Sequence, residues 1–533
     1  MKRLLRWSAT LVAVAALTFI GARAASYVNA RTSNVGQLDS TNTLAIPPLL
    51  APRDQNGRKA FELTLETGSA QFMPGKPAET WGVNGPYLGP TLRASRGDTV
   101  AVRVHNELPE ATTLHWHGMH LGGAADGGPH QVIAPGATWE PSWRIDQPAA
   151  TLWYHPHPHG ATADHVYRGV AGLFIVDDPE STALALPYQY GINDIPLIIQ
   201  DKRLHADGSL DFNERSFSPT GRLGDTILIN GTYNPHVSVR DARVRFRLLN
   251  ASNARIYNLG FADERPFDLI ATDAGLLERP HLLHRLQLSP GERAEIVVAF
   301  APGESIVLRS FPPDLGTNFF ERRFSGGDDS FDLLQIRAAT HPDPAPPVAQ
   351  RLAAPEPLNQ TNATRTRRFE LAEDETINHQ RMDMTRIDAV VPVGTPEIWE
   401  VHNGGGSPHN FHVHGGSFRV VQYGDGPLPA QLDGLKDTVY VRPGTVVRFL
   451  VRFDHTADPE TPFMFHCHIL QHEDHGMMGQ FVVTEQAPPR IAAVSAPASA
   501  ASGMLPGGHG SATVTRSEAG AMTGGTETAG ASE

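Results

Sequence analysis

Short apolar runs, several with alternating polar positions, recur along most of the chain. Clear examples span residues 99–105, 171–176, 244–249, 294–300 and 446–452. Successive side chains of a β-strand point to opposite faces, so a period of two over a short run predicts a half-buried strand. Gly, Pro and Asn interrupt these runs, and no long amphipathic helical pattern is evident. The pattern therefore predicts an all-β protein built from sandwiches of short strands.

The chain has 533 residues, which is too long for one ordinary hydrophobic core. About three domains are expected, and changes in composition place their limits. Pro is frequent after residue 340, and Ala, Ser, Gly and Thr dominate after residue 486, where we expect a disordered tail. The predicted segments are a signal peptide (1–24), a first domain (45–180), a middle domain (190–340), a linker (341–365), a third domain (366–487) and the tail (488–533).

The N-terminus has the pattern of an export signal. A basic start is followed by an apolar run over residues 11–20 and by Ala-Arg-Ala at 22–24. We therefore expect export to the periplasm or the extracellular space, with a retained membrane anchor as the alternative. No later segment is apolar enough to span a bilayer, so no membrane span is expected in the mature chain. The net charge of −13 argues against nucleic-acid binding.

Histidines recur in pairs separated by one residue, and these pairs reveal an internal duplication. The pairs are His115/His117, His155/His157, His412/His414 and His466/His468. In the second copy, Cys467 stands where Pro156 stands in the first. The first and third domains therefore look like copies of one unit. The middle domain has no such pair and is expected to act as a spacer.

Each His-x-His pair directs two imidazoles to one point, because residues two apart on a strand share a face. One pair alone would carry little weight in a chain with 25 histidines. Four pairs are hard to explain as core residues, since each buried imidazole would need hydrogen-bond partners. Eight imidazoles instead suit a cluster of copper ions.

Cys467 is the sole cysteine, so an intramolecular disulfide is excluded. His466 and His468 share one face of the strand, so Cys467 faces the opposite way. His409 lies three residues before His412 and is likewise on the face opposite to its neighbouring pair. Cys467 and His409 are therefore expected to meet on the far side of the strands.

His472 and Met477 follow Cys467 in a turn that we expect at the end of the strand. One thiolate, two imidazoles and a more distant thioether make a blue-copper electron-transfer site. Met477 as an ordinary packing residue is the alternative. An electron that arrives at such a copper has a path through the flanking histidines to the imidazole cluster. This arrangement couples one-electron oxidation to the four-electron reduction of dioxygen to water.

The sequence resembles the three-domain, laccase-type multicopper oxidases, and within them most closely the bacterial copper-efflux oxidases. The resemblance covers about residues 50–485 and rests on four motifs. These are Thr113-Leu-His-Trp-His-Gly118, Trp153-Tyr-His-Pro-His157, His409-Asn-Phe-His-Val-His414 and His466-Cys-His-Ile-Leu-Gln-His-Glu-Asp-His-Gly-Met477. It implies three cupredoxin-like Greek-key β-sandwiches and four copper ions: one type 1, one type 2 and a type 3 pair.

The same resemblance implies a role for each ligand. The type 1 copper would be held by His409, Cys467, His472 and Met477. The type 2 copper would be held by His115 and His412. The type 3 pair would be held by His117, His155, His157, His414, His466 and His468. Asp126 and Glu473 match the proton-relay carboxylates of similar oxidases, with a turn-forming role as the alternative for Asp126.

The sequence departs from the copper-efflux oxidases where the electron donor would bind. It has no Met-rich insert before the third domain, and Gly404-Gly-Gly-Ser-Pro408 precedes His409. Met382, Asp383 and Met384 are the only remnant of such a site. A dedicated cuprous-ion site is therefore not expected.

The predicted activity is a copper-dependent oxidase that takes electrons from a small donor and gives them to dioxygen. The donor classes considered are phenols, aromatic amines, bilirubin-like compounds and cuprous or other low-valent metal ions. A nitrite reductase is one rival, although that family normally builds its catalytic copper between subunits. An exported copper-binding or copper-tolerance protein with little turnover is the rival from another class.

Overall fold

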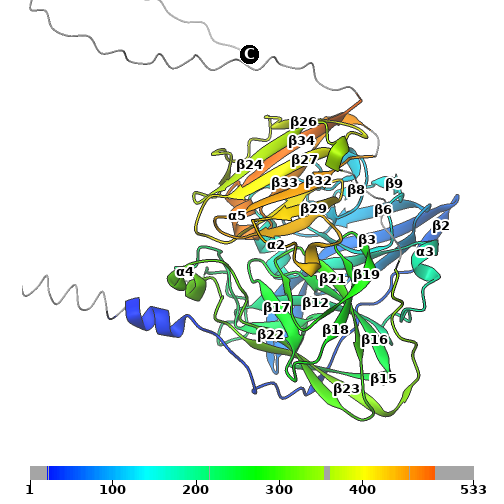
Figure 1. The fold of residues 1–533 in the computed structure, drawn as a ribbon, viewed down its shortest axis with the longest axis vertical. Helices are drawn as coiled ribbons and strands as arrows, with labels where there is room; N and C mark the ends of the chain where they lie inside the picture. The colour runs from blue at the N-terminus through cyan, green and yellow to red at the C-terminus, as the bar shows by residue number, and fades with distance from the viewer. Residues whose placement is uncertain (1–20, 22, 215–216, 353–359, 455–456, 486–533) are drawn as a thin grey trace, which may run out of the picture. The chain divides into compact units, whose positions relative to one another are not determined.

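The computed structural model describes residues 21, 23–214, 217–352, 360–454 and 457–485. Most of the expected signal peptide and all of the expected tail lie outside these residues. Strands dominate the described part of the chain, and three pairs of sheets follow one another along the sequence (Figure 1). The all-β prediction is confirmed. Among the helices of the described residues, none is both long and apolar enough to cross a bilayer.

The first pair of sheets supplies two of the histidine pairs. One sheet has the order β2-β3-β6-β8, with β4 paired to β3 and β9 to β6. Its strands are β2 (Arg53–Gln55), β3 (Arg58–Met73), β4 (Lys76–Val83), β6 (Thr99–Asn106), β8 (Thr138–Trp139) and β9 (Ser142–Arg144). The other sheet has the order β5-β11-β10-β7. Its strands are β5 (Leu92–Ser95), β7 (His115–His117), β10 (Ala150–His155) and β11 (Gly172–Asp177).

The middle pair of sheets also recruits a strand from the N-terminal segment. One sheet has the order β1-β15-β23-β22-β17-β20, and the other β14-β13-β12-β16-β21-β18-β19. The first comprises β1 (Asn42–Thr43), β15 (Pro235–Asp241), β17 (Tyr257–Phe261), β20 (Leu286–Leu288), β22 (Ser305–Phe311) and β23 (Phe331–Asp343). The second comprises β12 (Asp194–Lys202), β13 (Thr226–Ile229), β14 (Thr232–Tyr233), β16 (Arg243–Asn250), β18 (Phe267–Thr272), β19 (Gly275–Leu283) and β21 (Arg293–Ala299). Strand β1 precedes the first sandwich in sequence but pairs in parallel with β15.

The third pair of sheets carries the remaining histidine pairs. Its sheets have the orders β25-β24-β27-β32-β29-β30 and β26-β34-β33-β28-β31. The first comprises β24 (Thr366–Ala372), β25 (Thr376–Ile377), β27 (Glu397–Asn403), β29 (Phe418–Tyr423), β30 (Leu435–Lys436) and β32 (Val446–Val451). The second comprises β26 (Ala389–Pro392), β28 (His409–Val413), β31 (Thr438–Val441), β33 (Asp458–His466) and β34 (Met478–Thr484).

Helices in the described residues are short and lie in the connections between strands. They are η1 (Gly123–Ala125), α2 (Thr162–Arg168), α3 (Pro179–Thr182), α4 (Phe319–Phe324), η2 (Gln360–Asn362), η3 (Ala430–Leu432) and α5 (Leu470–Asp474), besides a helical turn over residues 23–29. The five strands predicted from alternation correspond to β6, β11, β16, β21 and β32, each within one residue at either end. β6 alternates between buried and more exposed side chains, as expected of a strand with one face on a core. β11, β16 and β21 are buried along nearly their whole length, so their short apolar runs mark them better than strict alternation does.

The apolar core joins the first and third sandwiches. A single cluster of buried side chains contains Trp116 and Phe174 from the first and Trp399 and Phe465 from the third. The middle sandwich has a separate cluster of its own, which includes Phe246. Continuous packing between the two histidine-bearing sandwiches fixes their facing strands against each other. A close-packed interior is hardly compressible, so one strand cannot shift without straining its neighbours.

Candidate metal centre

Both histidine-bearing sandwiches use the same strand pairing to present their imidazoles. β7 pairs antiparallel with β10, which sets His115 opposite His155. β28 pairs antiparallel with β33, which sets His412 opposite His466. In each copy, the two His-x-His pairs therefore lie on neighbouring strands. The strand period of two directs the four histidines of a copy to one face of its sheet.

The imidazoles of the two copies interleave across the contact between the sandwiches. The ring of His115 stacks on that of His414, with centroids 3.8 Å apart and planes 20° apart. The ring of His117 stacks on that of His412 at 3.8 Å and 10°. Each stack joins one histidine from the first sandwich to one from the third, so the cluster exists only where the two copies meet.

Ring nitrogens face one another at distances that suit a shared metal ion. The Nε2 atom of His466 lies 3.1 Å from the Nε2 of His157 and 3.1 Å from that of His414. His117 Nδ1 lies 3.4 Å from His155 Nε2. Two nitrogens bound to one ion at about 2 Å each lie about 3 Å apart when the bonds are near perpendicular. These spacings fit ligands that converge on metal ions.

Hydrogen bonds select which nitrogen of His115 and His412 faces the cluster. His115 Nδ1 donates to the carbonyl of Asp126 at 2.9 Å, and His412 Nδ1 donates to the carbonyl of Asp437 at 2.9 Å. The Nε2 atoms of both rings are buried and have no hydrogen-bond partner among the described residues. His115 and His412 belong to one group of potential ligands together with His414. A buried nitrogen without a partner is costly unless a ligand occupies the space before it.

Burial lowers the pKa of several imidazoles of the cluster and so favours their neutral form. The pKa of His412 and of His414 is held well below 6.5, first by burial and then by neighbouring imidazoles. The same causes lower the pKa of His117, His155 and His468. A neutral imidazole offers a lone pair to a metal, so no proton has to leave these rings when an ion binds.

A second group of ligands lies on the opposite side of the same strand end. Cys467 Sγ is 3.7 Å from His409 Nδ1 and 3.6 Å from His472 Nδ1, and the two nitrogens are 3.1 Å apart. All three side chains are buried. Met477 is also buried, and its carbonyl accepts the Cys467 N–H at 3.1 Å. The structure thus brings together the side chains of His409, Cys467 and His472, and the Met477 backbone contacts Cys467.

His472 lies in helix α5 rather than in a simple turn. Its Nε2 donates to the carbonyl of Pro219 at 2.7 Å, which leaves Nδ1 directed at the thiol. Such a bond on the far nitrogen fixes the orientation of a ligating ring. Burial raises the pKa of the Cys467 thiol to about 12, so a metal that binds there must displace the proton.

The strand parity predicted from the sequence agrees with this geometry. His466 belongs to the imidazole group with His157 and His414, whereas the adjacent Cys467 belongs to the group with His409 and His472. The two groups are therefore adjacent along the backbone, because Cys467 is bonded directly to His466 and His468.

The two carboxylates expected near the cluster are buried beside it. Asp126 Oδ2 accepts from His414 Nδ1 at 2.8 Å, while Asp126 Oδ1 has no partner among the described side chains and backbone. Glu473 lies 3.2 Å from His466 Nδ1 and 3.5 Å from His157 Nδ1. Both acids thus contact rings of the cluster directly, as their proposed role in proton supply requires.

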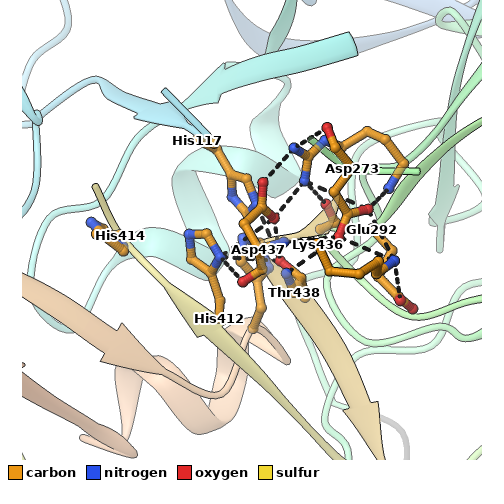
Figure 2. A network of polar contacts seen from close by, with 12 residues as sticks. His117, Asp273, Glu292, His412, His414, Lys436, Asp437 and Thr438 are labelled. Atoms are coloured by element: carbon orange, nitrogen blue, oxygen red, sulfur yellow. Dashed lines mark hydrogen bonds and ion pairs between the residues drawn. The ribbon is translucent and has the colours of Figure 1, made fainter. Parts of the chain in front are cut away.

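Asp437 is a third carboxylate at the cluster, and the sequence analysis missed it. Its Oδ1 accepts from His117 Nε2 at 3.0 Å, and its backbone carbonyl accepts from His412. Figure 2 shows it between the two imidazoles and the charged side chains of Lys436 and Glu292. No spacing rule singles it out, because it follows His412 by 25 residues, whereas Asp126 follows His115 by 11.

Comparison with known proteins agrees with this arrangement. Two sequence models, each described as multicopper oxidase, match residues 64–181 and 344–487. A multicopper oxidase of Staphylococcus aureus is 36% identical over 85% of this chain and 95% of its own length. The chain belongs to the multicopper oxidase family. The crystal structure of a laccase from Pediococcus acidilactici matches at 34% identity with a TM-score of 0.75, covering 83% of this chain and 94% of that one.

Membership of the multicopper oxidase family confirms the cupredoxin-like fold and implies copper binding. The similar proteins have names that refer to different functions. The cell division protein FtsP of Escherichia coli strain K12 is 38% identical over 83% of this chain and 92% of its own length. Activity therefore has to be argued from the site of this particular multicopper oxidase.

Proposed function

We propose that this multicopper oxidase couples one-electron oxidation of a small donor to the reduction of dioxygen to water. One observation carries the proposal: a buried thiol–imidazole group and an imidazole cluster meet at the adjacent residues His466 and Cys467. When bound, copper would supply electron transfer at the first group and dioxygen reduction at the second. A chain that served only to store copper would have no need of this back-to-back placement.

The proposed ligands follow the pattern of the family and the nitrogen atoms that face each group. His409, Cys467, His472 and Met477 would hold the type 1 ion. The type 2 ion would be held by His115 and His412. The type 3 pair would be held by His117, His155, His157, His414, His466 and His468. We retain 45–180, 190–340 and 366–487 as the three domains, with the linker at 341–365.

Asp126 and Glu473 would supply protons to the oxygen side. Each is buried and contacts two ring nitrogens of the cluster within 3.5 Å. Dioxygen reduction consumes protons, so carboxylates at hydrogen-bonding distance shorten the path that each proton travels. The free Oδ1 of Asp126 gives this side chain an acceptor that no other described group occupies.

Phenols, aromatic amines, bilirubin-like compounds and low-valent metal ions are the proposed donors. The electron would enter at the type 1 group, near the edge of His472 that faces Pro219. The N-terminal pattern of basic start, apolar run and Ala-Arg-Ala supports export to the periplasm or the extracellular space.

Oxygen uptake by the copper-loaded full chain tests the proposal. We expect uptake with at least one of three donors: cuprous ion, a substituted phenol or bilirubin. Cys467→Ser serves as the matched control, because serine keeps the volume but not the thiolate. This variant is expected to lose the blue absorption and the uptake while it retains copper at the imidazole cluster.

Two outcomes would contradict the proposal. A fully copper-loaded wild-type chain without uptake for any of the three donors would favour a copper-binding protein with little turnover. A Cys467→Ser variant that stays blue would refute the assignment of the type 1 group.

A further inference from the structure

Arg293, in the middle sandwich, is a buried arginine with an acceptor for every hydrogen on its guanidinium. Nε donates to the Thr151 carbonyl at 3.0 Å. Nη1 donates to the Gly291 carbonyl at 3.0 Å and to Asp437 Oδ1 at 2.7 Å. Nη2 donates to the Asp273 carbonyl at 3.0 Å and to Asp437 Oδ2 at 2.5 Å. A guanidinium has five donors in a fixed fork, and all five are used here.

The partners of Arg293 come from all three sandwiches. Thr151 lies on β10 of the first, Gly291 and Asp273 belong to the middle one, and Asp437 precedes β31 of the third. Arg293 is fully buried, so water does not compete for these bonds. Burial lowers the pKa of Arg293, but the carboxylates of Asp437 and Asp273 outweigh that effect and raise it. The side chain therefore stays charged where the three sandwiches meet.

Asp437, which Arg293 holds in place, contacts two rings of the imidazole cluster. Its Oδ1 accepts from His117 Nε2, which leaves His117 Nδ1 to face His155 at 3.4 Å. Its carbonyl accepts from His412 Nδ1, which leaves Nε2 of that ring toward the cluster. Asp437 thus helps to select the ligating nitrogen of both rings, together with the neighbouring Thr438 hydroxyl, which lies 3.2 Å from His117 Nε2 and 3.1 Å from His412 Nδ1 (Figure 2).

Asp126 and Asp437 occupy equivalent places in the duplicated sandwiches but differ in their freedom. Each uses its carbonyl for a histidine of its own copy and its carboxylate for a histidine of the other. Asp126 Oδ1 has no partner within the described part of the chain, whereas Arg293 contacts both carboxylate oxygens of Asp437. The first arrangement leaves a carboxylate oxygen available, and the second holds the carboxylate in place.

Two glycines record how closely the middle sandwich approaches the cluster. Gly118 ends the His-Trp-His-Gly motif with a φ of +85°, and a Cβ there would lie 2.6 Å from the Asp437 carboxylate and 2.7 Å from Arg293 Nη2. Gly291, also at φ +85°, leaves room for the ring of His468, which a Cβ would meet at 3.0 Å. The turn that leads into β21 is therefore packed directly on ligand residues.

We propose that Arg293 is a positioning residue of the copper cluster, acting through Asp437 on the rings of His117 and His412. The middle sandwich then contributes to the oxygen side of the site, beyond the spacer role expected from its sequence. This inference rests on copper occupying the imidazole cluster, as the proposed function requires. It does not depend on which donor is oxidised.

Lysine cannot replace Arg293 in this role. Its ammonium has three donors on a flexible stem and cannot hold both oxygens of Asp437 in one plane. Arg293→Lys keeps the charge, so the variant isolates the fixed fork from the electrostatic contribution. Loss of a group that orients a metal-binding side chain typically weakens metal binding about 10- to 100-fold.

Arg247→Lys provides a matched control in the same sandwich. Arg247 is also buried, makes a two-oxygen pair with Asp194 and reaches the Thr151 hydroxyl of the first sandwich. Among the described residues, its polar contacts are with Asp194, Glu295 and Thr151, and they include neither Asp437 nor a histidine of the cluster. Each variant loses one buried guanidinium that binds both oxygens of an aspartate. A general loss of stability should therefore affect the two variants alike.

The experiment compares copper retention in the wild-type chain and in both lysine variants. Each copper-loaded full chain is exposed to a chelator, and copper content, the type 2 EPR signal and the blue absorption are followed. Arg293→Lys is expected to lose type 2 copper at least about tenfold faster than wild type while it stays blue. Arg247→Lys is expected to lose it at the wild-type rate.

The proposal would be overturned if Arg293→Lys retained its type 2 signal like wild type, or if both variants lost it equally. If Arg293→Lys does not fold, Asp437→Asn tests the same chain of contacts, since an amide offers one acceptor oxygen and an NH2 donor in place of two acceptor oxygens. A wild-type EPR signal and copper content in Asp437→Asn would equally refute the proposal. Absent oxygen uptake in wild type would refute the oxidase alone, because copper retention is measured independently.

Discussion

At the residue scale, Asp126 and Asp437 make similar contacts to the cluster but differ in how firmly their carboxylates are held. Both are buried, and both touch imidazoles of the opposite copy. Arg293 holds both oxygens of Asp437, whereas one oxygen of Asp126 is free among the described residues. A carboxylate with a free oxygen can take up and release a proton without breaking an ion pair.

Substitution of Asp126 by Asn should therefore slow turnover without disturbing electron entry. Asparagine keeps the size and one acceptor oxygen but cannot carry the proton. We expect the rate of oxygen reduction to fall about 10²- to 10⁴-fold, the usual contribution of a positioned acid or base. Stopped-flow reduction of the blue absorption under anaerobic conditions should match wild type. Unchanged turnover would remove Asp126 from proton supply.

At the scale of elements, helix α5 ties the third sandwich to the first. Its residue Asp474 accepts from the backbone N–H groups of Thr162 and Ala163 at 2.8 and 2.9 Å. These N–H groups open helix α2, whose own N-cap, Ala161, offers no side-chain acceptor. Asp474 thus caps in trans a helix that lies over 300 residues away in sequence.

Loss of this cap should destabilise the chain without removing its copper ligands. Asp474→Ala is expected to lower the free energy of unfolding by about 1 to 2 kcal/mol, as for other lost N-caps. Asp474→Asn, which keeps one acceptor oxygen, should recover part of that loss. Chemical denaturation of the metal-free variants measures both values. Equal stabilities of the alanine variant and wild type would contradict the capping role.

At the scale of the molecule, the apolar core and the histidine cluster are parts of one junction between the first and third sandwiches. The core positions the facing strands, and the buried imidazoles occupy the space between them. The junction keeps these rings away from water, and burial lowers the pKa of His117, His412 and His414. The metal-free protein is therefore expected to be less stable in acid.

The metal-free chain should lose stability as the pH falls below about 6.5. Burial lowers the pKa of His157 and of His120 from 6.5 to about 4. The unfolded chain therefore binds protons between these values that the folded chain does not, so stability falls with pH across that window. Each such histidine removes about 2 kcal/mol at about pH 5.

Thermal unfolding of the metal-free chain at about pH 7.5 and about pH 5 measures this loss. The copper-loaded chain should lose less, because a nitrogen bound to metal cannot take up a proton until the ion leaves. An unfolding temperature independent of pH in the metal-free chain would contradict the assignment of these rings as buried and neutral.

The sequence by itself determined the strand-rich fold and indicated the duplication, and it predicted the two groups of ligands. Alternation marks a strand wherever one face packs on a core, and strand parity separates Cys467 from His466 and His468 without any knowledge of tertiary contacts. Motif resemblance then assigned a role to each histidine. Each of these features shows in short stretches of the chain, either as alternating positions or as closely spaced motifs.

Only the tertiary structure decided what surrounds those ligands. The stacks of His115 on His414 and of His117 on His412 form because two sandwiches meet. Arg293 and Asp437 are 144 residues apart, and their pairing depends on a junction of three sandwiches. Local periodicity carries no information about such contacts, because side chains from distant segments become neighbours only when the sandwiches pack. The sequence therefore predicted the ligands, whereas packing decided which groups orient them.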